Sequence, residues 1–412
     1  MDDERVLIVG AGHAAAQLCG SLRQEGWSGE IVLVGDEPSL PYHRPPLSKT
    51  YLAGECDLDE LLIRKSDFYD KHAVAFRQDR VTSVRRDDRE VVLEGGERLR
   101  YDHLVLSLGA RPRPLTVSGS QMAGVHYLRD SAHVDAIREE LSNARHAVIV
   151  GAGYIGLETA AALRSLGVDV TVLETAERVL QRVTAAEVSA FYGRVHREEG
   201  VDLRLGVQVE ALEGDSRIRG VRLTDGQLIE CDLLIVGIGV VPNVEIGHDS
   251  GLEIENGIAT DQYGRTSDPH IYAAGDCASS YTSRYGRRLR LESVPNAVEH
   301  AKAIAAAICG KEKPITALPW FWSDQYDLKL QIAGLNAGYD QVVVRGDSSS
   351  TRDFTCFYLR DGKLIAADCI NQPQEFMFSK RAIAQELSPD PQFLTRPDVD
   401  LRELLQPGAV RA

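Results

Sequence analysis

The chain has 412 residues, of which 43% are hydrophobic and 26% charged, and its formal net charge is −15. This composition is ordinary for a protein with a packed core, and it excludes a disordered, collagen-like or disulfide-scaffold chain. The acidic balance argues against a nucleic-acid partner, and the longest apolar run, residues 233–241, is too short to cross a bilayer. The opening residues carry no apolar stretch typical of a secretory signal, so we expect no membrane contact and a cytoplasmic location.

The first predicted unit has a strand over residues 6–9, then a glycine turn, a helix and a second apolar run. This order predicts a βαβ unit with a buried parallel sheet. Gly10 would make the tight turn, Gly12 would let the backbone approach a pyrophosphate, and the small Ala15 would let helix and strand pack closely. Asp36, beyond the second strand, is placed to accept hydrogen bonds from ribose hydroxyls.

A second unit of the same kind follows later in the chain. The apolar run 103–108 predicts another strand of the first sheet, and the proline-rich stretch 112–114 predicts a crossing between domains. A new strand is then expected at 147–150, and a second glycine turn opens a helix directly after it.

The second glycine turn repeats the arrangement of the first. Gly151, Gly153 and Gly156 occupy the three small positions, and Glu174 is the acid beyond the next strand. A carboxylate there binds ribose hydroxyls and repels a 2′-phosphate, so Glu174 favours NADH over NADPH. Two such units imply two dinucleotides, and the economical assignment is one flavin and one nicotinamide.

The later part of the chain completes the expected fold. Runs at 233–236 and 271–274 predict further parallel strands, whereas short runs separated by Gly, Asp and Ser after about residue 313 predict an antiparallel sheet. The predicted class is α/β, with two Rossmann-like dinucleotide-binding domains and a C-terminal α+β domain. The predicted boundaries are 1–113 and 241–313 for the first domain, 114–240 for the second and 314–412 for the third.

The seven cysteines are scattered and form no C-x-x-C cluster. We therefore expect reduced, mostly buried thiols rather than a zinc site, an iron–sulfur cluster or a local redox disulfide. Cys56 stands alone, and no C-x-x-x-x-C pair follows the first predicted helix, which excludes a disulfide mechanism of the glutathione reductase type.

Seven motifs stand along the chain: GAG at 10–12, RPPLSK at 44–49, GAGYIGLE at 151–158, TSDP at 266–269, AGD at 274–276, SVPNA at 293–297 and PWFWSDQ at 319–325. Over essentially its whole length the sequence thereby resembles the FAD-dependent, NADH-using ferredoxin reductases of bacterial oxygenase systems, the putidaredoxin reductase-like family. The last two motifs are the more discriminating ones. The resemblance implies a glutathione reductase-like flavoprotein fold with FAD in the first domain and NADH in the second.

The resemblance also implies which residues contact the cofactors. The implied FAD contacts, besides the loop residues Gly10, Gly12 and Ala15, are Ala14, Asp36, Arg44, Lys49, Val81, Arg129, Asp276, Val294 and Trp322. The implied NADH contacts are Gly151, Gly153, Ile155, Gly156, Glu158 and Glu174. Asp276 would hold a ribityl hydroxyl, or would only cap a helix. Trp320 and Trp322 would pack at the flavin edge between cofactor and partner, or would be plain core or interface tryptophans.

Lys49 and Glu158 are the predicted catalytic pair. In the family the matching residues form an ion pair beside flavin N5, where the lysine polarises the ring as it accepts hydride and the glutamate orients the carboxamide. The alternative is a solvated lysine after a proline turn and an ordinary helix residue.

The family further implies a partner on a separate chain, an acidic [2Fe–2S] ferredoxin that feeds a cytochrome P450 or a ring-hydroxylating dioxygenase. Three local basic runs could steer such a partner, or could be scattered solvated cations; they are Arg64-Lys65, Arg284 with Arg287, Arg288 and Arg290, and Lys380-Arg381. A monomer or weak dimer is expected. Alternative functions are a rubredoxin- or nitrite-reductase-associated NADH reductase, and a redox-sensing interaction protein like apoptosis-inducing factor.

Overall fold

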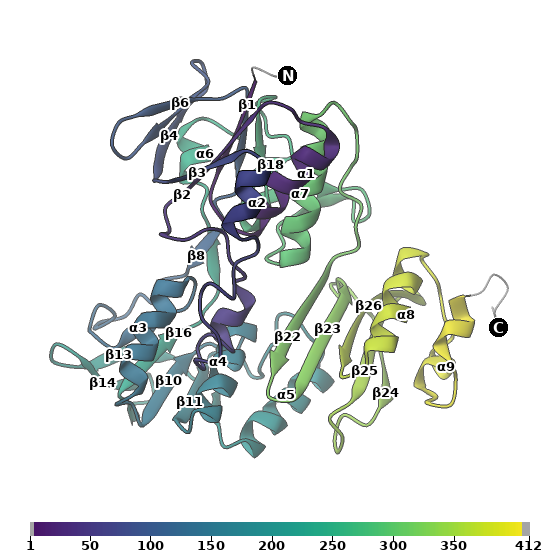
Figure 1. Ribbon diagram of the computed structural model, residues 1–412. Coiled ribbons are helices and arrows are strands. Elements are labelled where there is room, and N and C mark those ends of the chain that lie inside the picture. Colours follow the sequence, from purple (N-terminus) through teal and green to yellow (C-terminus); the bar gives the residue numbers. More distant parts are fainter. Residues whose placement is uncertain (1–3, 406–412) are drawn as a thin grey trace. The chain divides into compact units, whose positions relative to one another are not determined.

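The computed structural model describes residues 4–405, which form two compact units assembled from separate segments of the chain (Figure 1). The described part of unit 1 is residues 4–44, Leu58–Arg111 and Val240–Ala317. The described part of unit 2 is Pro45–Asp57, Pro112–Gly239 and residues 318–405. The division into three domains made from the sequence stays a prediction.

A five-stranded sheet in the order β19-β7-β1-β2-β3 forms the centre of unit 1. All neighbouring strands in it run parallel. Its strands are β1 (Arg5–Val9), β2 (Glu30–Gly35), β3 (Val74–Gln78), β7 (His103–Leu106) and β19 (Ile271–Ala273). Because such strands are covered on both faces, most of them appear in the sequence as uninterrupted apolar runs.

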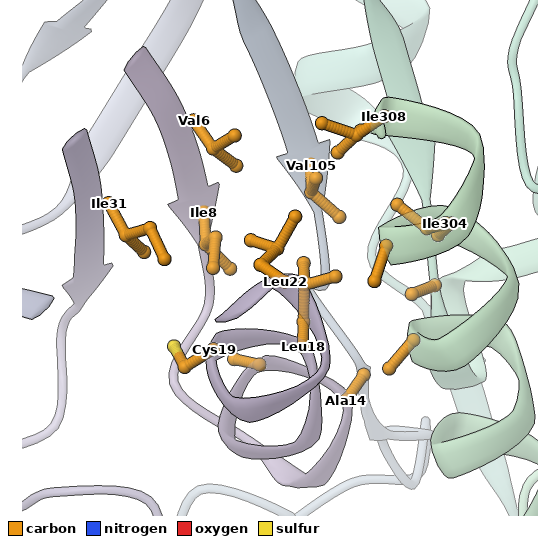
Figure 2. Packing of buried hydrophobic residues seen from close by; sticks show 14 of the residues in the cluster. Val6, Ile8, Ala14, Leu18, Cys19, Leu22, Ile31, Val105, Ile304 and Ile308 are labelled. Carbon is orange, nitrogen blue, oxygen red and sulfur yellow. The ribbon is translucent and has the colours of Figure 1, made fainter. Parts of the chain in front are cut away.

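Two helices from opposite parts of the chain cover one face of this sheet. In Figure 2, Leu18 and Leu22 of α1 (His13–Glu25) lie between the strands and Ile304 of α7 (Val294–Ile308). The strand residues labelled in the same buried cluster are Val6, Ile8, Ile31 and Val105. Full burial of a side chain of this size contributes about 1.5–3 kcal/mol, so this packing places the first turns of both helices firmly.

The other elements of unit 1 are short. They are α2 (Ser66–Lys71), the antiparallel strands β4 (Val81–Arg85), β5 (Glu90–Leu93) and β6 (Arg98–Arg100), the strands β18 (Ile258–Thr260), β20 (Ala278–Thr282) and β21 (Arg287–Leu289), the helix α6 (Glu245–Asp249) and the 3-10 turn η2 (Gly275–Cys277). Strands β8 (Ala110–Pro112) and β17 (Val240–Pro242) pair where the chain leaves unit 1 and where it returns.

Two strands of unit 1 end earlier than their apolar runs predict. The run 103–108 ends as a strand at Leu106, and the run 271–274 ends at Ala273. After Leu106 the chain turns toward the first glycine loop, because the Ser107 hydroxyl donates to the carbonyl oxygens of Val9 and Gly10 at 2.9 and 2.8 Å. The last two residues of this run, Ser107 and Leu108, therefore belong to a loop and not to the strand.

Unit 2 contains a second parallel sheet, in the order β12-β11-β10-β16-β9. Its strands are β9 (Val125–Tyr127), β10 (His146–Val150), β11 (Asp169–Glu174), β12 (Asp202–Leu205) and β16 (Leu233–Val236). The other elements of this part are η1 (Pro45–Ser48), α3 (Ser131–Leu141), α4 (Tyr154–Ser165), α5 (Ala186–Glu198) and the antiparallel strands β13 (Val209–Gly214), β14 (Ile218–Leu223) and β15 (Leu228–Glu230).

The C-terminal part of unit 2 is the expected antiparallel sheet, in the order β22-β23-β26-β25-β24. Its strands are β22 (Trp320–Gln325), β23 (Leu328–Gly334), β24 (Gln341–Gly346), β25 (Phe354–Arg360) and β26 (Lys363–Ile370), followed by α8 (Pro373–Ala384), α9 (Pro391–Thr395) and η3 (Leu401–Leu405). Figure 1 shows α8 on one face of this sheet. The predicted α/β class with two parallel sheets and a C-terminal antiparallel sheet is confirmed.

Within residues 4–405, no helix is both long and apolar enough to span a bilayer. The same residues hold no cluster of His, Cys, Asp and Glu arranged for a metal ion. All seven cysteines are free thiols, and five of them are buried, as expected from their scattered positions.

Candidate functional site

The first glycine loop joins β1 to α1 in unit 1. Gly10 has a φ of +98°, and an added Cβ would lie 2.4 Å from the carbonyl oxygen of Ser107, so only glycine fits there. Gly12, the N-cap residue of α1, has open space where a Cβ would stand and provides no side-chain cap. Ala15 is fully buried. The free N–H groups of the first helical turn therefore border open space, which suits a bound phosphate.

Two other predicted FAD elements meet this loop inside unit 1. A Cβ added to Gly275 would lie 3.7 Å from the Cβ atoms of both Ala14 and Ala297. Asp276 directly follows Gly275 in η2, and Ala297 lies in the first turn of α7, which begins at Val294. The fold thus brings the loop, the Gly-Asp turn and a second helix N-terminus to one place.

A buried histidine supports this arrangement. Nδ1 of His300 accepts a hydrogen bond from the N–H of Gly275 at 3.2 Å. Burial lowers the pKa of His300 to about 4, so the ring is neutral near pH 7 and keeps Nδ1 as an acceptor. His300 was not singled out in the sequence, where nothing near it marks a turn that it could hold.

The remaining unit 1 candidates lie near the end of β2. Asp36 pairs with Arg80 at 3.2 Å, and both side chains are more than half exposed. Arg44 forms an ion pair with Glu37. The Val81 side chain is 5% exposed and packs in the core, so a cofactor contact there would come from its backbone.

The second glycine loop joins β10 to α4 in unit 2 and repeats the geometry of the first. Gly151 has a φ of +107°, and Gly153 is an N-cap with open space at its Cβ position and no side-chain cap. A Cβ added to Gly156 would lie 2.0 Å from the carbonyl oxygen of Gly151. Ile155, in the first turn of α4, is 40% exposed.

Glu174 lies at the end of β11 and folds its carboxylate onto this loop. One carboxylate oxygen accepts from the N–H of Ala152 at 2.7 Å, and the other accepts from the N–H of Ala176 at 2.9 Å. The side chain is thereby held beside the glycine turn, where a ribose bound with its pyrophosphate at the helix would meet it.

The Gly156→Ala substitution is expected to weaken dinucleotide binding in unit 2 at least tenfold and to destabilise the protein by about 1–3 kcal/mol, because the new methyl group meets backbone and cannot be accommodated without moving the loop. Isothermal titration with NADH and thermal unfolding measure the two effects. Gly153→Ala is the matched control, since its Cβ enters open space. It should weaken binding and leave stability nearly unchanged. Equal stability losses in both variants would contradict this reading of the loop.

Lys49 and Glu158, the predicted pair, form an ion pair within unit 2. Lys49 Nζ lies 2.6 Å from Oε2 of Glu158, and the two side chains are 18% and 6% exposed. Lys49 also donates to the carbonyl oxygen of Pro45 at 3.1 Å, which ties it to η1. Glu158 is thus neither exposed nor unpaired, unlike an ordinary helix residue.

Two serines complete this charged centre, and the sequence reasoning did not single them out. The hydroxyl of Ser48 donates to Oε2 of Glu158, and the hydroxyl of Ser323 donates to Oε1, both at 2.6 Å. Both serines lie inside motifs that carried the family resemblance, and that position is the signal that could have identified them. The centre, defined as Lys49, Glu158, Ser48 and Ser323, joins η1, α4 and β22.

The aromatic residues of β22 alternate between its two faces. Phe321 lies on the face of Ser323, with its ring centroid 4.8 Å from that of Tyr154 at the start of α4. Trp320 and Trp322 lie on the other face, with their ring centroids 5.6 Å apart. The Nζ atom of Lys380 lies 5.0 Å from the ring centroid of Trp320. The three predicted FAD contacts that belong to unit 2 are Lys49, Arg129 and Trp322.

One basic run is less available to a partner than its sequence suggests. Arg288 donates to the carbonyl oxygen of Thr260 and pairs with Glu255 at 3.2 Å, and Arg290 pairs with Glu292 at 2.6 Å. Reversing the charge at either arginine would break contacts inside unit 1. The interpretation of 284–290 as a docking run stays a prediction, and the exposed Arg287 is the member whose charge can be reversed in a docking test without breaking these contacts.

Comparisons with known proteins agree with this geometry. A model of the pyridine nucleotide-disulphide oxidoreductase family matches residues 4–301, and a reductase C-terminal model matches residues 320–405. Putidaredoxin reductase of Pseudomonas putida is 43% identical over 410 residues, which cover 98% of this chain and 97% of that protein. Rhodocoxin reductase of Rhodococcus erythropolis is 40% identical, covering 96% of this chain and 93% of that one.

Solved structures of ferredoxin reductases are also similar over nearly the whole chain. The ferredoxin reductase for the CYP199A2 system of Rhodopseudomonas palustris has a TM-score of 0.95 and 41% identity, covering 98% of this chain and 100% of that one. The covalent complex of putidaredoxin reductase with putidaredoxin matches with a TM-score of 0.95 and 43% identity, covering 98% of this chain and 99% of that one.

Proposed function

The chain belongs to the pyridine nucleotide-disulphide oxidoreductase family, and on this premise we propose that it is a ferredoxin–NAD⁺ reductase, which passes electrons from NADH through FAD to a separate [2Fe–2S] ferredoxin. The observation that carries the proposal is the repeated glycine loop, which opens an uncapped helix once in each unit, together with the glutamate of the second helix, Glu158, and its paired lysine, Lys49. The ferredoxin would in turn supply a cytochrome P450 or a ring-hydroxylating dioxygenase. We place this reaction in the cytoplasm, with the reductase as a monomer or weak dimer.

The relatives support the choice of electron acceptor. Putidaredoxin reductase, the reductase for a P450 system and the ferredoxin–NAD⁺ reductase component of the anthranilate 1,2-dioxygenase system of Burkholderia cepacia are all similar over nearly the whole chain. One of the similar structures is itself a reductase joined to its ferredoxin-type partner, putidaredoxin. These findings favour the ferredoxin over the rubredoxin-type and sensor alternatives.

The residues present fit both cofactors. The loop of Gly10 and Gly12, with the N-terminus of α7, would hold FAD, and the loop of Gly151 and Gly153 would hold NADH. When bound, FAD supplies the chemistry of accepting a hydride and releasing electrons singly. Val294, the first residue of α7, would place its backbone N–H and the positive end of the helix dipole toward a ring that gains negative charge.

We assign electrostatic stabilisation and substrate orientation in the hydride transfer to Lys49 and Glu158. The Lys49 ammonium supplies a fixed positive charge where negative charge develops, and a partly buried site strengthens that effect relative to water. Glu158 holds this ammonium in place and would offer its carboxylate to the nicotinamide carboxamide. The side chains need not exchange a proton with substrate in this scheme.

Stopped-flow absorbance tests the proposal directly. The purified protein is mixed with NADH, with NADPH, and with NADH plus a [2Fe–2S] ferredoxin from the same genome. We expect fast bleaching of the flavin by NADH, slow bleaching by NADPH and rapid reduction of the ferredoxin. Absence of flavin would refute the assignment, and bleaching without transfer to any co-encoded ferredoxin would favour the rubredoxin-type or sensor functions.

Glu174→Ala is expected to lower the preference for NADH over NADPH about tenfold, because the carboxylate no longer repels a 2′-phosphate or binds the ribose hydroxyls. The ratio of second-order rate constants for flavin reduction by the two cofactors measures this change. The exposed Glu177, three residues further along, provides the control, and Glu177→Ala should keep the ratio. An unchanged ratio in Glu174→Ala would remove Glu174 from the site.

A further inference from the structure

A line of buried hydrogen bonds leads away from Glu158 into the C-terminal sheet of unit 2. Ser323, which donates to Oε1 of Glu158, accepts in turn from Nε2 of Gln325 at 3.1 Å. Ser323 is fully buried, and Gln325 is 1% exposed. Both residues lie on β22 and, two positions apart, point to the same face of the strand.

The line continues into α5. The amide oxygen Oε1 of Gln325 lies 2.8 Å from Nε2 of His196, and Nδ1 of His196 lies 3.2 Å from the hydroxyl of Tyr326. His196 is fully buried, and this burial lowers its pKa to about 4, so the ring is neutral near pH 7 and carries one N–H.

The direction of every bond in the line follows from its end at Glu158. A carboxylate paired with Lys49 only accepts hydrogen bonds, so Ser323 must donate to it and must itself accept from the amide nitrogen of Gln325. The amide oxygen of Gln325 then faces His196 and accepts its N–H, which leaves Nδ1 to accept from Tyr326. All donors in the line therefore point toward Glu158.

We propose that Ser323, Gln325 and His196 are positioning residues for hydride transfer, which hold the Glu158 carboxylate in one orientation and, through it, the Lys49 ammonium. The inference rests on the proposed function of the Lys49–Glu158 pair. An amide does not pass a proton on without rearranging its own bonds, so the line orients the carboxylate and does not conduct protons. Buried polar side chains must each find a hydrogen-bond partner, so such a line is satisfied in only one arrangement of its members. Apolar residues of similar volume would fill the same space without fixing the orientation of the carboxylate.

The Gln325→Glu substitution tests the proposal with almost no change of shape. A carboxylate at residue 325 cannot donate to Ser323, so the serine proton turns toward residue 325 and Glu158 loses one of its donors. We expect the rate of flavin reduction at saturating NADH to fall about tenfold, with the dissociation constant of NADH changing less than about twofold. The effect should grow with rising pH in this variant, because a protonated carboxyl at residue 325 can still donate to Ser323, whereas the ionised form accepts from both Ser323 and His196.

Gln341→Glu is the matched control, because it adds the same charge to an exposed position of the same sheet. It should keep the wild-type rate and pH profile. Ser323→Ala is the second variant and covers the case in which Gln325→Glu does not fold, since it removes a single oxygen and adds no charge; it too should reduce the rate about tenfold with little effect on NADH binding.

The outcomes separate the two levels of inference. Folded, FAD-containing variants of Ser323 and Gln325 that are reduced at the wild-type rate would overturn the positioning role and leave the proposed function intact. Failure of the wild-type protein itself to be reduced by NADH would instead refute the proposed function. A slowed rate confined to Ser323→Ala and Gln325→Glu, with Gln341→Glu unaffected, supports the inference.

Discussion

The Lys49→Met substitution is expected to slow the reduction of the flavin by NADH about a hundredfold and to lower the free energy of unfolding by about 3–5 kcal/mol. Lys49 is the cation 2.6 Å from Glu158, whose side chain is only 6% exposed. Methionine fills the same volume but leaves the carboxylate with the hydroxyls of Ser48 and Ser323 and no positive charge. Stopped-flow kinetics and denaturant unfolding measure the two effects.

Glu158→Gln separates the stability effect from the catalytic one. Combined with Lys49→Met, it removes the unpaired buried charge, so the double variant should regain most of the lost stability. Its rate of flavin reduction should remain as low as that of Lys49→Met, because the double variant has neither the ammonium nor the carboxylate to act on the nicotinamide. Recovery of the rate in the double variant would show that the pair acts only as a structural ion pair.

The Asp368→Asn substitution is expected to stabilise the protein relative to wild type by an amount that grows with pH. Asp368 lies on β26 and is 1% exposed; its Oδ2 accepts from the hydroxyl of Tyr358, and its Oδ1 has no hydrogen-bond partner in the described structure. Burial raises the pKa of Asp368 to about 7 from its usual value near 4. The folded protein therefore keeps a proton that the unfolded chain loses between about pH 4 and pH 7.

The sign follows from proton linkage. Because the folded state binds the extra proton, this group stabilises the wild type fully below pH 4, and the stabilisation is lost as pH rises to 7, at about 1.4 kcal/mol per pH unit. Asparagine does not ionise, so the advantage of the variant should grow by about 4 kcal/mol between pH 4 and pH 8. Guanidinium unfolding of both proteins across this range measures the difference.

Subtracting the free energy of unfolding of the wild type from that of Asp368→Asn at each pH also removes the contribution of His196. The pKa of that residue is lowered to about 4 by burial, so its stabilisation is present above pH 6.5 and is lost as pH falls toward 4, opposite in sign to that of Asp368. His196 is the same in both proteins and cancels. A stability difference that does not change with pH would contradict the assignment to Asp368.

Much of the fold could be predicted from local patterns. The strands around Val6–Val9 and Val148–Val150 are apolar throughout because parallel strands are covered on both faces, and the glycine turns follow them directly. Strand ends were less predictable. The run 103–108 extends two residues beyond the end of its strand, because Ser107 and Leu108 form a loop that lies against Gly10.

The charged centre shows where sequence reasoning stops. Lys49 and Glu158 were named through the family resemblance, but Ser48 and Ser323, which donate to the same carboxylate from 110 and 165 residues away, were not. Nothing in the local sequence of a serine tells which distant carboxylate it will meet. The same limit applies to Arg288 and Arg290, because their sequence neighbours do not reveal that they pair with Glu255 and Glu292.

The two glycine loops can be predicted from local sequence, because a positive φ at Gly10 and Gly151 and the start of a helix are properties of a few consecutive residues. The polar side chains around Glu158 depend instead on how distant segments pack together. Hydrogen bonds such as that between Gln325 and His196 depend on packing a β-strand against a helix from another part of the chain. Local backbone geometry is visible as a pattern in the sequence, whereas the hydrogen-bond partners of a buried charge depend on which distant segments pack around it.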